Sequence, residues 1–433
     1  MNVPLLLLVA GVGCLSIKTL FTLPIIGNKI ILSDLFFILS AMTADRNKDY
    51  FVRLKEIKPI VLLLASFLCW LVLSSFFSVD AFLHNKKAML EIGSLAYDAA
   101  IFILFYLLLD SPRKLFLVLI AWFFAMVLAD LIAGYAILSG ATWGFSRGAL
   151  IGSFAGANQP QIVLVPLLAA LFFVVSARRA ALVVRGSAFL VVVSSFSFML
   201  ISGSRSALVM VLIQIVGSVL ICLLTRQYRN FISNSLLWGQ SFFYVCLIAL
   251  FLVAGPSWAQ KNKVFSGLQR VAESVELVRH HTEDNYDSAF YDRLSTGRVA
   301  IIKAAIPLFK ESPLIGFGLQ QTRNMEEIHH TEIHCLYLVM LFETGIIGFL
   351  LFSFFLFAVI RKTYFKLIGL PFSYDRLLFH ALLLGGVAMG AYNMVTNGSR
   401  QRELWILLGI ITAYSSFSNC ALLFADSENT NSN

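Results

Sequence analysis

Residues 115–138 read LFLVLIAWFFAMVLADLIAGYAIL, and Asp130 is the single charged residue among them. A run of about 20 apolar residues is long enough to cross the hydrocarbon core of a bilayer as one helix. The whole chain has this character, since 59% of its 433 residues are hydrophobic and only 13% are charged. Soluble domains are about a quarter charged. The composition therefore excludes an ordinary soluble protein, a disordered chain, a disulfide scaffold and a nucleic-acid-binding module.

The apolar runs predict an all-α integral membrane protein with about twelve transmembrane helices and one large outer loop that contains amphipathic helices. Nine helices are expected in residues 1–254 and three in residues 334–424, with a polar loop region, 255–333, between them. Residues 425–433 are expected to form a short tail. The predicted spans are residues 4–24, 30–42, 59–77, 88–109, 115–138, 161–176, 181–201, 207–224, 231–254, 334–360, 377–394 and 404–424. The first apolar run lacks the basic start of a cleavable signal, so it is expected to be retained as a span.

Basic residues fall unevenly between the two sets of alternate short loops. One set holds sixteen Lys and Arg, and the other holds seven. Because Lys and Arg favour the cytoplasmic side, the richer set is predicted to be cytoplasmic, together with both termini. The loop 255–333 is then outside, and the net charge of +9 is mostly a consequence of topology. The richer set comprises residues 43–58, 110–114, 177–186, 225–230 and 361–376.

The preference of basic residues for the cytoplasmic side does not explain two arginines in the predicted outer loops. Arg147 and Arg205 are each the only basic residue of an outer connection. Arg205 lies in the small-residue turn Ser202-Gly203-Ser204-Arg205-Ser206-Ala207. Small residues let a lipid headgroup approach the backbone, and a guanidinium offers donors in a plane that matches phosphate oxygens. The alternative is an arginine that extends to the membrane interface. This alternative is favoured for Arg147, whose segment Ser146–Leu150 resembles the Arg205 turn only weakly.

A second segment, Arg293-Leu294-Ser295-Thr296-Gly297-Arg298, precedes an amphipathic run over residues 299–310. We expect this run to form a helix on the membrane surface, capped by Ser295 or Thr296 and stopped at Pro313. An arginine in the first turn is unfavourable to the helix dipole, so Arg298 points to a requirement beyond helix stability. A solvated loop arginine is the alternative reading, and the better one for Arg293.

The third segment, His330-Thr331-Glu332-Ile333-His334-Cys335-Leu336-Tyr337, opens the tenth predicted span. It lacks the HExxH zincin arrangement, and no third ligand accompanies His330 and His334, so no metal site is predicted. With Thr331 as N-cap, His334 would lie in the first helical turn, where the dipole disfavours imidazolium. A neutral histidine is what a general base near pH 7 requires. An interfacial histidine without a chemical task is the alternative.

Taken together, Arg205, Arg298 and His334 are predicted to lie on the outer side of the membrane. Arginines that hold a diphosphate, with a base that deprotonates a hydroxyl, would form a group-transfer site that needs no metal. The six cysteines show no C-x-x-C spacing, so neither a metal site nor a redox site is predicted from them.

These segments resemble the bacterial O-antigen ligase and polymerase superfamily of membrane glycosyltransferases. The likeness covers most of residues 140–360 and rests on three patterns. They are Ser204-Arg205-Ser206-Ala207, then Gly297-Arg298 leading to Pro313-Leu314-Ile315-Gly316-Phe317-Gly318, and then His334 followed by Gly345 and Gly348. The last is similar to the histidine-to-GxxG pattern of the ligase branch. Where the family usually has an amide or hydroxyl residue after the histidine, this chain has Cys335.

The resemblance implies an O-antigen ligase of lipopolysaccharide biosynthesis, in the bacterial inner membrane with its active site facing the periplasm. Such enzymes transfer a glycan from undecaprenyl pyrophosphate to a sugar hydroxyl of lipid A–core, without cofactor or metal and with inversion. By the resemblance, Arg205 and Arg298 hold the pyrophosphate and His334 is the base, with Arg147, Arg293 and His330 as secondary candidates. An O-antigen polymerase of the same fold is the nearest alternative. A lipid-linked glycan transporter or flippase is the alternative from another class.

Overall fold

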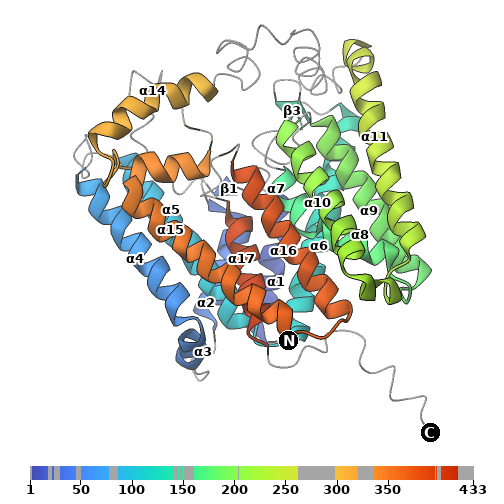
Figure 1. The fold of residues 1–433 in the computed structure, drawn as a ribbon, viewed down its shortest axis with the longest axis horizontal. Helices are drawn as coiled ribbons and strands as arrows, with labels where there is room; N and C mark the ends of the chain where they lie inside the picture. Colours follow the sequence, from blue (N-terminus) through green and yellow to red (C-terminus); the bar gives the residue numbers. More distant parts are fainter. Residues whose placement is uncertain are drawn as a thin grey trace.

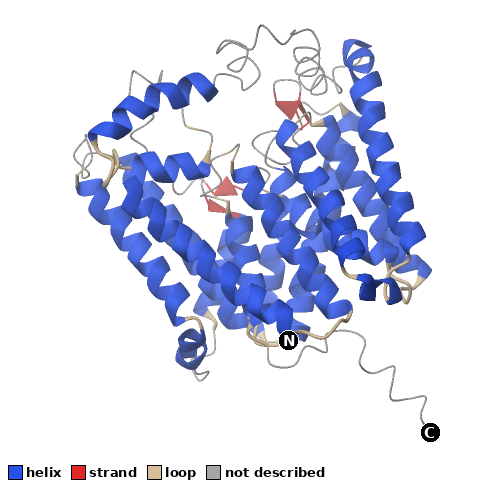
Figure 2. Cartoon of the chain, viewed as in Figure 1, coloured by secondary structure: helices blue, strands red, loops and turns tan. Residues whose placement is uncertain are grey.

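The computed structural model of the protein is a bundle of helices with two pairs of two-residue strands (Figures 1 and 2). It describes residues 2–17, 22–23, 30–44, 50–77, 86–140, 145–146, 149–150, 160–202, 204–261, 298–319, 333, 335–394, 396 and 401–417, and structural statements below concern these. The helices are α1 (Val3–Gly13), α2 (Leu32–Met42), α3 (Tyr50–Glu56), α4 (Lys58–Phe76), α5 (Lys86–Leu108), α6 (Pro112–Ser139), α7 (Pro160–Leu164), α8 (Leu168–Ser176), α9 (Leu182–Ile201), α10 (Arg205–Leu224), α11 (Asn234–Lys261), α14 (Arg298–Glu311), α15 (Leu336–Gly369), α16 (Tyr374–Asn393) and α17 (Arg402–Ser415). Short 3-10 helices are η1 (Cys14–Ser16), η4 (Val165–Leu167) and η5 (Arg226–Asn230). The antiparallel strand pairs are β1 (Thr22–Leu23) with β2 (Ile30–Ile31) and β3 (Phe145–Ser146) with β4 (Ala149–Leu150).

The structure agrees with the expected multi-pass helical membrane protein, but it does not establish the number of twelve spans. Six of the described helices are long and apolar enough to cross a membrane, namely Lys58–Phe76, Ala88–Leu108, Pro112–Ser139, Leu182–Ile201, Ser206–Leu224 and Leu336–Gly369. Every predicted span contains a described helix, but several are short. α2, for example, has 11 residues, which reach about 16 Å at 1.5 Å per residue. The hydrocarbon core is about 30 Å thick, so the number twelve stays a prediction.

The sixth predicted span is interrupted rather than continuous. α7 gives way to the 3-10 helix η4 at Pro166 before α8 resumes, because proline has no N–H to continue the helical pattern. Side chains of other helices donate to carbonyls of this segment: Trp122 Nε1 to Val163 O at 2.8 Å and Gln214 Nε2 to Val165 O at 3.1 Å. These contacts give buried carbonyl groups partners in an interior without water.

The outer surface of the bundle is apolar where a bilayer would surround it. Large apolar side chains on α9 and α11 are exposed, among them Leu190 at 68% and Phe242 at 71%. The interior is packed with aromatic rings such as those of Trp122 and Trp405, which are fully buried. Exposed apolar contacts on this scale are typical of surfaces covered by lipid rather than water.

One end of the bundle, the lower end in Figure 1, gathers the basic connections (Figure 1). Here Arg53 Nη2 donates to Leu109 O at 3.1 Å, and Arg178 Nε donates to Ile232 O at 3.1 Å. Arg376 Nη1 donates to Leu370 O at 2.7 Å, just beyond the end of α15. Basic side chains near helix C-termini satisfy carbonyls that lack intrahelical partners. The N- and C-terminal helices, α1 and α17, also begin and end, respectively, at this end.

Acidic residues from distant parts of the sequence form a buried cluster around Arg402. Asp34, at the start of α2, accepts from Tyr97 Oη at 2.9 Å and pairs with Arg402 Nε at 2.7 Å. Asp98 is buried beside them and interacts electrostatically with Arg402 and Glu403. Residues far apart in the sequence meet because α5 packs along α17. Asp130 instead binds two serine hydroxyls of α9.

Replacement of Arg402 by alanine is expected to destabilise the fold by about 3–5 kcal/mol, because it leaves the buried Asp34 carboxylate without its cation. The control is Lys114→Ala, which removes an exposed i,i+4 pair with Asp110 that is expected to contribute about 0.3–0.5 kcal/mol. Thermal unfolding in detergent measures both. Equal losses for the two variants would contradict a structural role of the Asp34–Arg402 pair.

Candidate functional site

The small-residue turn around Arg205 separates two helices, as expected. α9 ends at Ile201, and α10 begins at Arg205 with Ser204 as its N-cap. Ser204 Oγ accepts from Ala207 N at 3.4 Å and lies 2.8 Å from Ser206 Oγ. The backbone of Arg205 thus begins a helix, where free N–H groups and the dipole favour anions. Its side chain lies outside the described part of the structure.

The amphipathic run is also helical. α14 extends over Arg298–Glu311 and ends two residues before Pro313, in agreement with the expected run over 299–310. The expected caps, Ser295 and Thr296, lie outside the described residues. Ala305 is fully buried, and Ile301 and Phe309 pack in the same small apolar cluster. The side chain of Arg298 is not among those described. Arg147 and Arg293 lie outside the described residues altogether.

α15 is broken near its start, and the break is the central feature of the site. Gly345 has φ 69° and ψ −178°, a conformation that is essentially restricted to glycine. The short part before it, Leu336–Thr344, is called the half-helix below. It lies across the upper end of the long part of α15 (Figure 2). The break leaves carbonyls on one side and N–H groups on the other without helical partners.

The segment Pro313–Gly318 supplies most of the missing partners. Phe317 N donates to Phe342 O at 3.0 Å, and Gly318 N donates to Glu343 O at 2.9 Å. In the other direction, Ile346 N donates to Pro313 O at 2.9 Å. The next carbonyl of the half-helix, Thr344 O, accepts from Trp70 Nε1 of α4 at 2.8 Å.

Two of the sequence patterns therefore meet in space. A Cβ atom on Gly345 would lie 2.2 Å from Leu314 O, and one on Gly316 would lie 2.5 Å from Gly345 N. Gly316 and Gly318 both have positive φ, of 81° and 91°. A Cβ on Gly348 would lie 2.1 Å from Thr344 Oγ1. Gly316 and Gly345 are thus explained by close backbone packing at the break, and Gly348 by its close contact with the Thr344 side chain.

The start of α15 differs from the prediction. The helix begins at Leu336 with Cys335 as N-cap, so the expectation of a helix capped at Thr331 with residue 334 in its first turn is wrong. No side-chain cap is needed, because Leu336 N donates to Thr396 O at 3.0 Å. Cys335 makes no side-chain cap hydrogen bond and packs against the apolar cluster around Phe342.

His330, Thr331 and His334 lie outside the described residues, so the structure gives no geometry for the predicted base. Its described neighbours are Ile333, which is buried, and Cys335. The described residues contain no group of three or more His, Cys, Asp and Glu that could hold a metal ion. Since both histidines are outside this set, the metal-free site stays a prediction.

The elements that bear the candidates share one end of the bundle. The start of α10, helix α14 and the half-helix all lie at the upper end in Figure 1, opposite the basic connections. Contacts agree, because the half-helix is bonded to the end of α16, and α16 packs antiparallel to α10 with Gly217 against Leu384. No contact between Arg205, Arg298 and His334 follows from this placement.

A family model described as O-antigen ligase matches residues 190–353. This match supports membership of the O-antigen ligase family. The matched segment begins in α9 and ends in the long part of α15, so it includes Arg205, Arg298, His334 and the break at Gly345. The match also supports a membrane glycosyltransferase of the O-antigen ligase or polymerase type. Comparison with curated proteins gives no match.

The Gly345→Ala substitution is expected to destabilise the fold by at least about 1–3 kcal/mol from backbone conformation alone. The matched control is Gly386→Ala in α16, where the new Cβ would lie 3.6 Å from Ile411 Cδ1, an ordinary contact. There alanine is expected to be neutral or to stabilise by about 0.5–1 kcal/mol. Melting temperatures in detergent give the comparison. An unperturbed Gly345→Ala protein would show that the break is not glycine-dependent.

Proposed function

We propose that the protein is an O-antigen ligase that transfers a glycan from undecaprenyl pyrophosphate to a sugar hydroxyl of lipid A–core. The observation that supports this most is the family match over 190–353, since it includes all three predicted site residues. The half-helix and the start of α10 lie at the same end of the bundle, which is consistent with one site between them.

Arg205 and Arg298 are proposed to bind the donor pyrophosphate. Each begins a helix, so backbone N–H groups there add to the guanidinium as donors to phosphate oxygens. The developing negative charge on the leaving pyrophosphate is then stabilised by groups that are already in place. Arg147, Arg293 and His330 are secondary candidates for the same surface.

His334 is proposed to be the general base. It takes the proton of the acceptor hydroxyl as the hydroxyl oxygen forms a bond with the anomeric carbon of the donor glycan. The bond between that carbon and the pyrophosphate oxygen breaks at the same time, and undecaprenyl pyrophosphate leaves with the electron pair. Attack opposite the leaving group inverts the anomeric configuration, and neither cofactor nor metal takes part.

The proposed orientation puts the basic end in the cytoplasm and the site at the periplasmic face of the inner membrane. Both termini are then cytoplasmic, the spans number about twelve, and the loop around α14 is periplasmic. The gathering of basic connections at one end of the bundle supports this orientation, because such residues are retained on the cytoplasmic side.

Transfer activity tests the chemistry. The purified full chain in liposomes with EDTA is given undecaprenyl-pyrophosphate glycan, with or without lipid A–core. We expect product only with lipid A–core, a loss of at least about 100-fold in kcat for His334→Ala, and a raised KM for the donor in Arg205→Ala and Arg298→Ala. Arg185→Ala, at the basic end, is the control. Longer lipid-linked glycan without acceptor would indicate a polymerase, and no transfer at all would favour a transporter.

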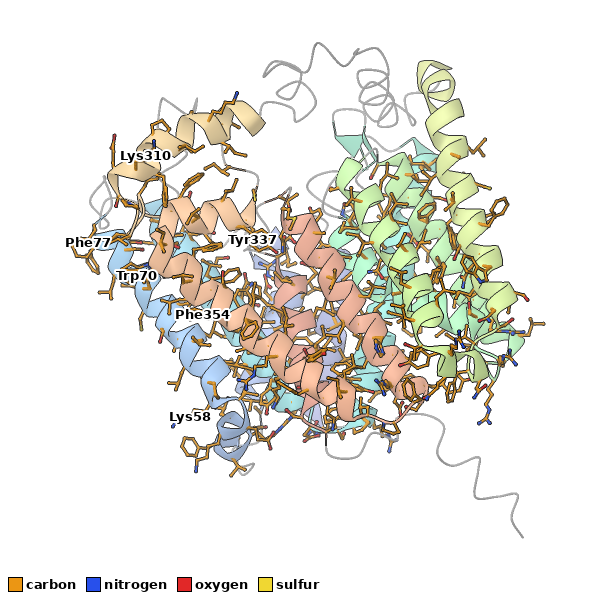
Figure 3. All side chains as sticks on the ribbon, in the orientation of Figure 1. Lys58, Trp70, Phe77, Lys310, Tyr337 and Phe354 are labelled. Carbon is orange, nitrogen blue, oxygen red and sulfur yellow. The ribbon has the colours of Figure 1, made fainter. Side chains whose placement is uncertain are left out.

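Cysteine labelling tests the orientation independently. Lys310 in α14 and Lys58 at the start of α4 lie at opposite ends of the bundle (Figure 3). Each is replaced by cysteine in a chain without other cysteines. A membrane-impermeant maleimide applied to cells with a permeabilised outer membrane is expected to label position 310 and to label position 58 only after the inner membrane is opened. The reverse pattern would invert the topology.

A further inference from the structure

The half-helix Leu336–Thr344 is tied to other elements by a side-chain hydrogen bond at each end. At its start, its own Tyr337 Oη donates to Gly390 O of α16 at 3.1 Å. At its end, Trp70 Nε1 of α4 donates to Thr344 O at 2.8 Å. Figure 3 shows Tyr337 and Trp70 near opposite ends of the half-helix. The two bonds thus connect it to two different helices of the bundle, α16 and α4.

Each anchor acts on a carbonyl in the last turn of a helix, Thr344 O of the half-helix and Gly390 O of α16. Thr344 directly precedes the break at Gly345, and the last carbonyls of a helix lack intrahelical partners. Gly390 is close enough that a Cβ there would lie 3.5 Å from Tyr337 Oη. The main-chain bond from Leu336 N to Thr396 O adds a third connection at the start of the half-helix.

The half-helix packs between the two apolar clusters. Val339 and Phe342 belong to the small cluster with α14 and Phe317, whereas Leu336 and Met340 are buried in the main core. Apolar packing has little directional preference. The hydrogen bonds to α4 and α16 add directional contacts that orient the half-helix relative to the bundle that contains α10.

We propose that Trp70 and Tyr337 are positioning residues for the transfer reaction. They hold the half-helix and its N-cap, Cys335, at a fixed place relative to the bundle that contains α10. This rests on the proposed function, in which His334 acts on a substrate whose diphosphate is bound by Arg205. Neither Trp70 nor Tyr337 is proposed to touch the reacting atoms.

The test uses Tyr337→Phe, which removes only the hydroxyl donor, and Trp70→Phe, which removes the indole donor together with part of the ring system. Two matched controls remove similar bonds elsewhere: Tyr414→Phe, whose hydroxyl donates to Asp375 O at 2.9 Å, and Trp122→Phe, whose indole donates to Val163 O at 2.8 Å. In the transfer assay with undecaprenyl-pyrophosphate glycan and lipid A–core, the first pair is expected to lose about ten- to a hundredfold in kcat. The donor KM is expected to change little, and the controls to keep their kcat.

A second readout does not depend on activity. With Cys335 as the only cysteine, its rate of labelling by N-ethylmaleimide reports how firmly the start of α15 is held. Trp70→Phe and Tyr337→Phe are expected to raise this rate severalfold, and Tyr414→Phe to leave it unchanged. If wild type transfers no glycan, the proposed function fails, and labelling alone decides the positioning role. Unchanged labelling, or a loss of kcat in the controls equal to that in the first pair, would overturn it.

Discussion

The broken helix α15 depends on hydrogen bonds that it cannot make by itself. In a bilayer no water is present to satisfy a free carbonyl or N–H, and each such group costs several kcal/mol. At the Gly345 break, every group whose bond the structure describes is bonded to another segment: Phe342 O, Glu343 O and Ile346 N to Pro313–Gly318, and Thr344 O to Trp70. The helix can be interrupted at Gly345 because Pro313–Gly318 and Trp70 of α4 provide hydrogen-bond partners for the groups at the break.

This requirement also explains the glycines. Gly345 takes a conformation that other residues avoid, while Gly316 and Gly348 make room for main-chain or side-chain atoms within 3 Å. Two of the patterns behind the family resemblance, PLIGFG and GxxG, are thus requirements of backbone packing rather than groups that would meet a substrate. The chemistry therefore has to be argued from other residues.

The sequence was a good guide to what depends on local composition. Apolar runs located the helices, the uneven distribution of Lys and Arg identified the end where basic connections gather, and the amphipathic run became α14. It failed where distant segments decide the outcome. The start of α15 is set by Thr396 O rather than by a cap at Thr331, and Asp98 joins Arg402 through the packing of α5 on α17. No local pattern contains either contact. The predicted roles of Arg205, Arg298 and His334 remain predictions.

The position of the proposed site depends on the same hydrogen bonds around the break in α15. Because the half-helix is bonded to α4, α16 and Pro313–Gly318, its direction and the place of its N-cap Cys335 are determined by these neighbours. The backbone of Arg205 is placed in a different way, by the Ser204 cap of α10. A reaction that needs a base and a diphosphate-binding arginine together must therefore keep two differently anchored parts of the chain in a fixed relative position. Side-chain anchors such as Trp70 and Tyr337 can do this without lining the site, since a displacement of about 1 Å is enough to slow an oriented reaction by about a hundredfold.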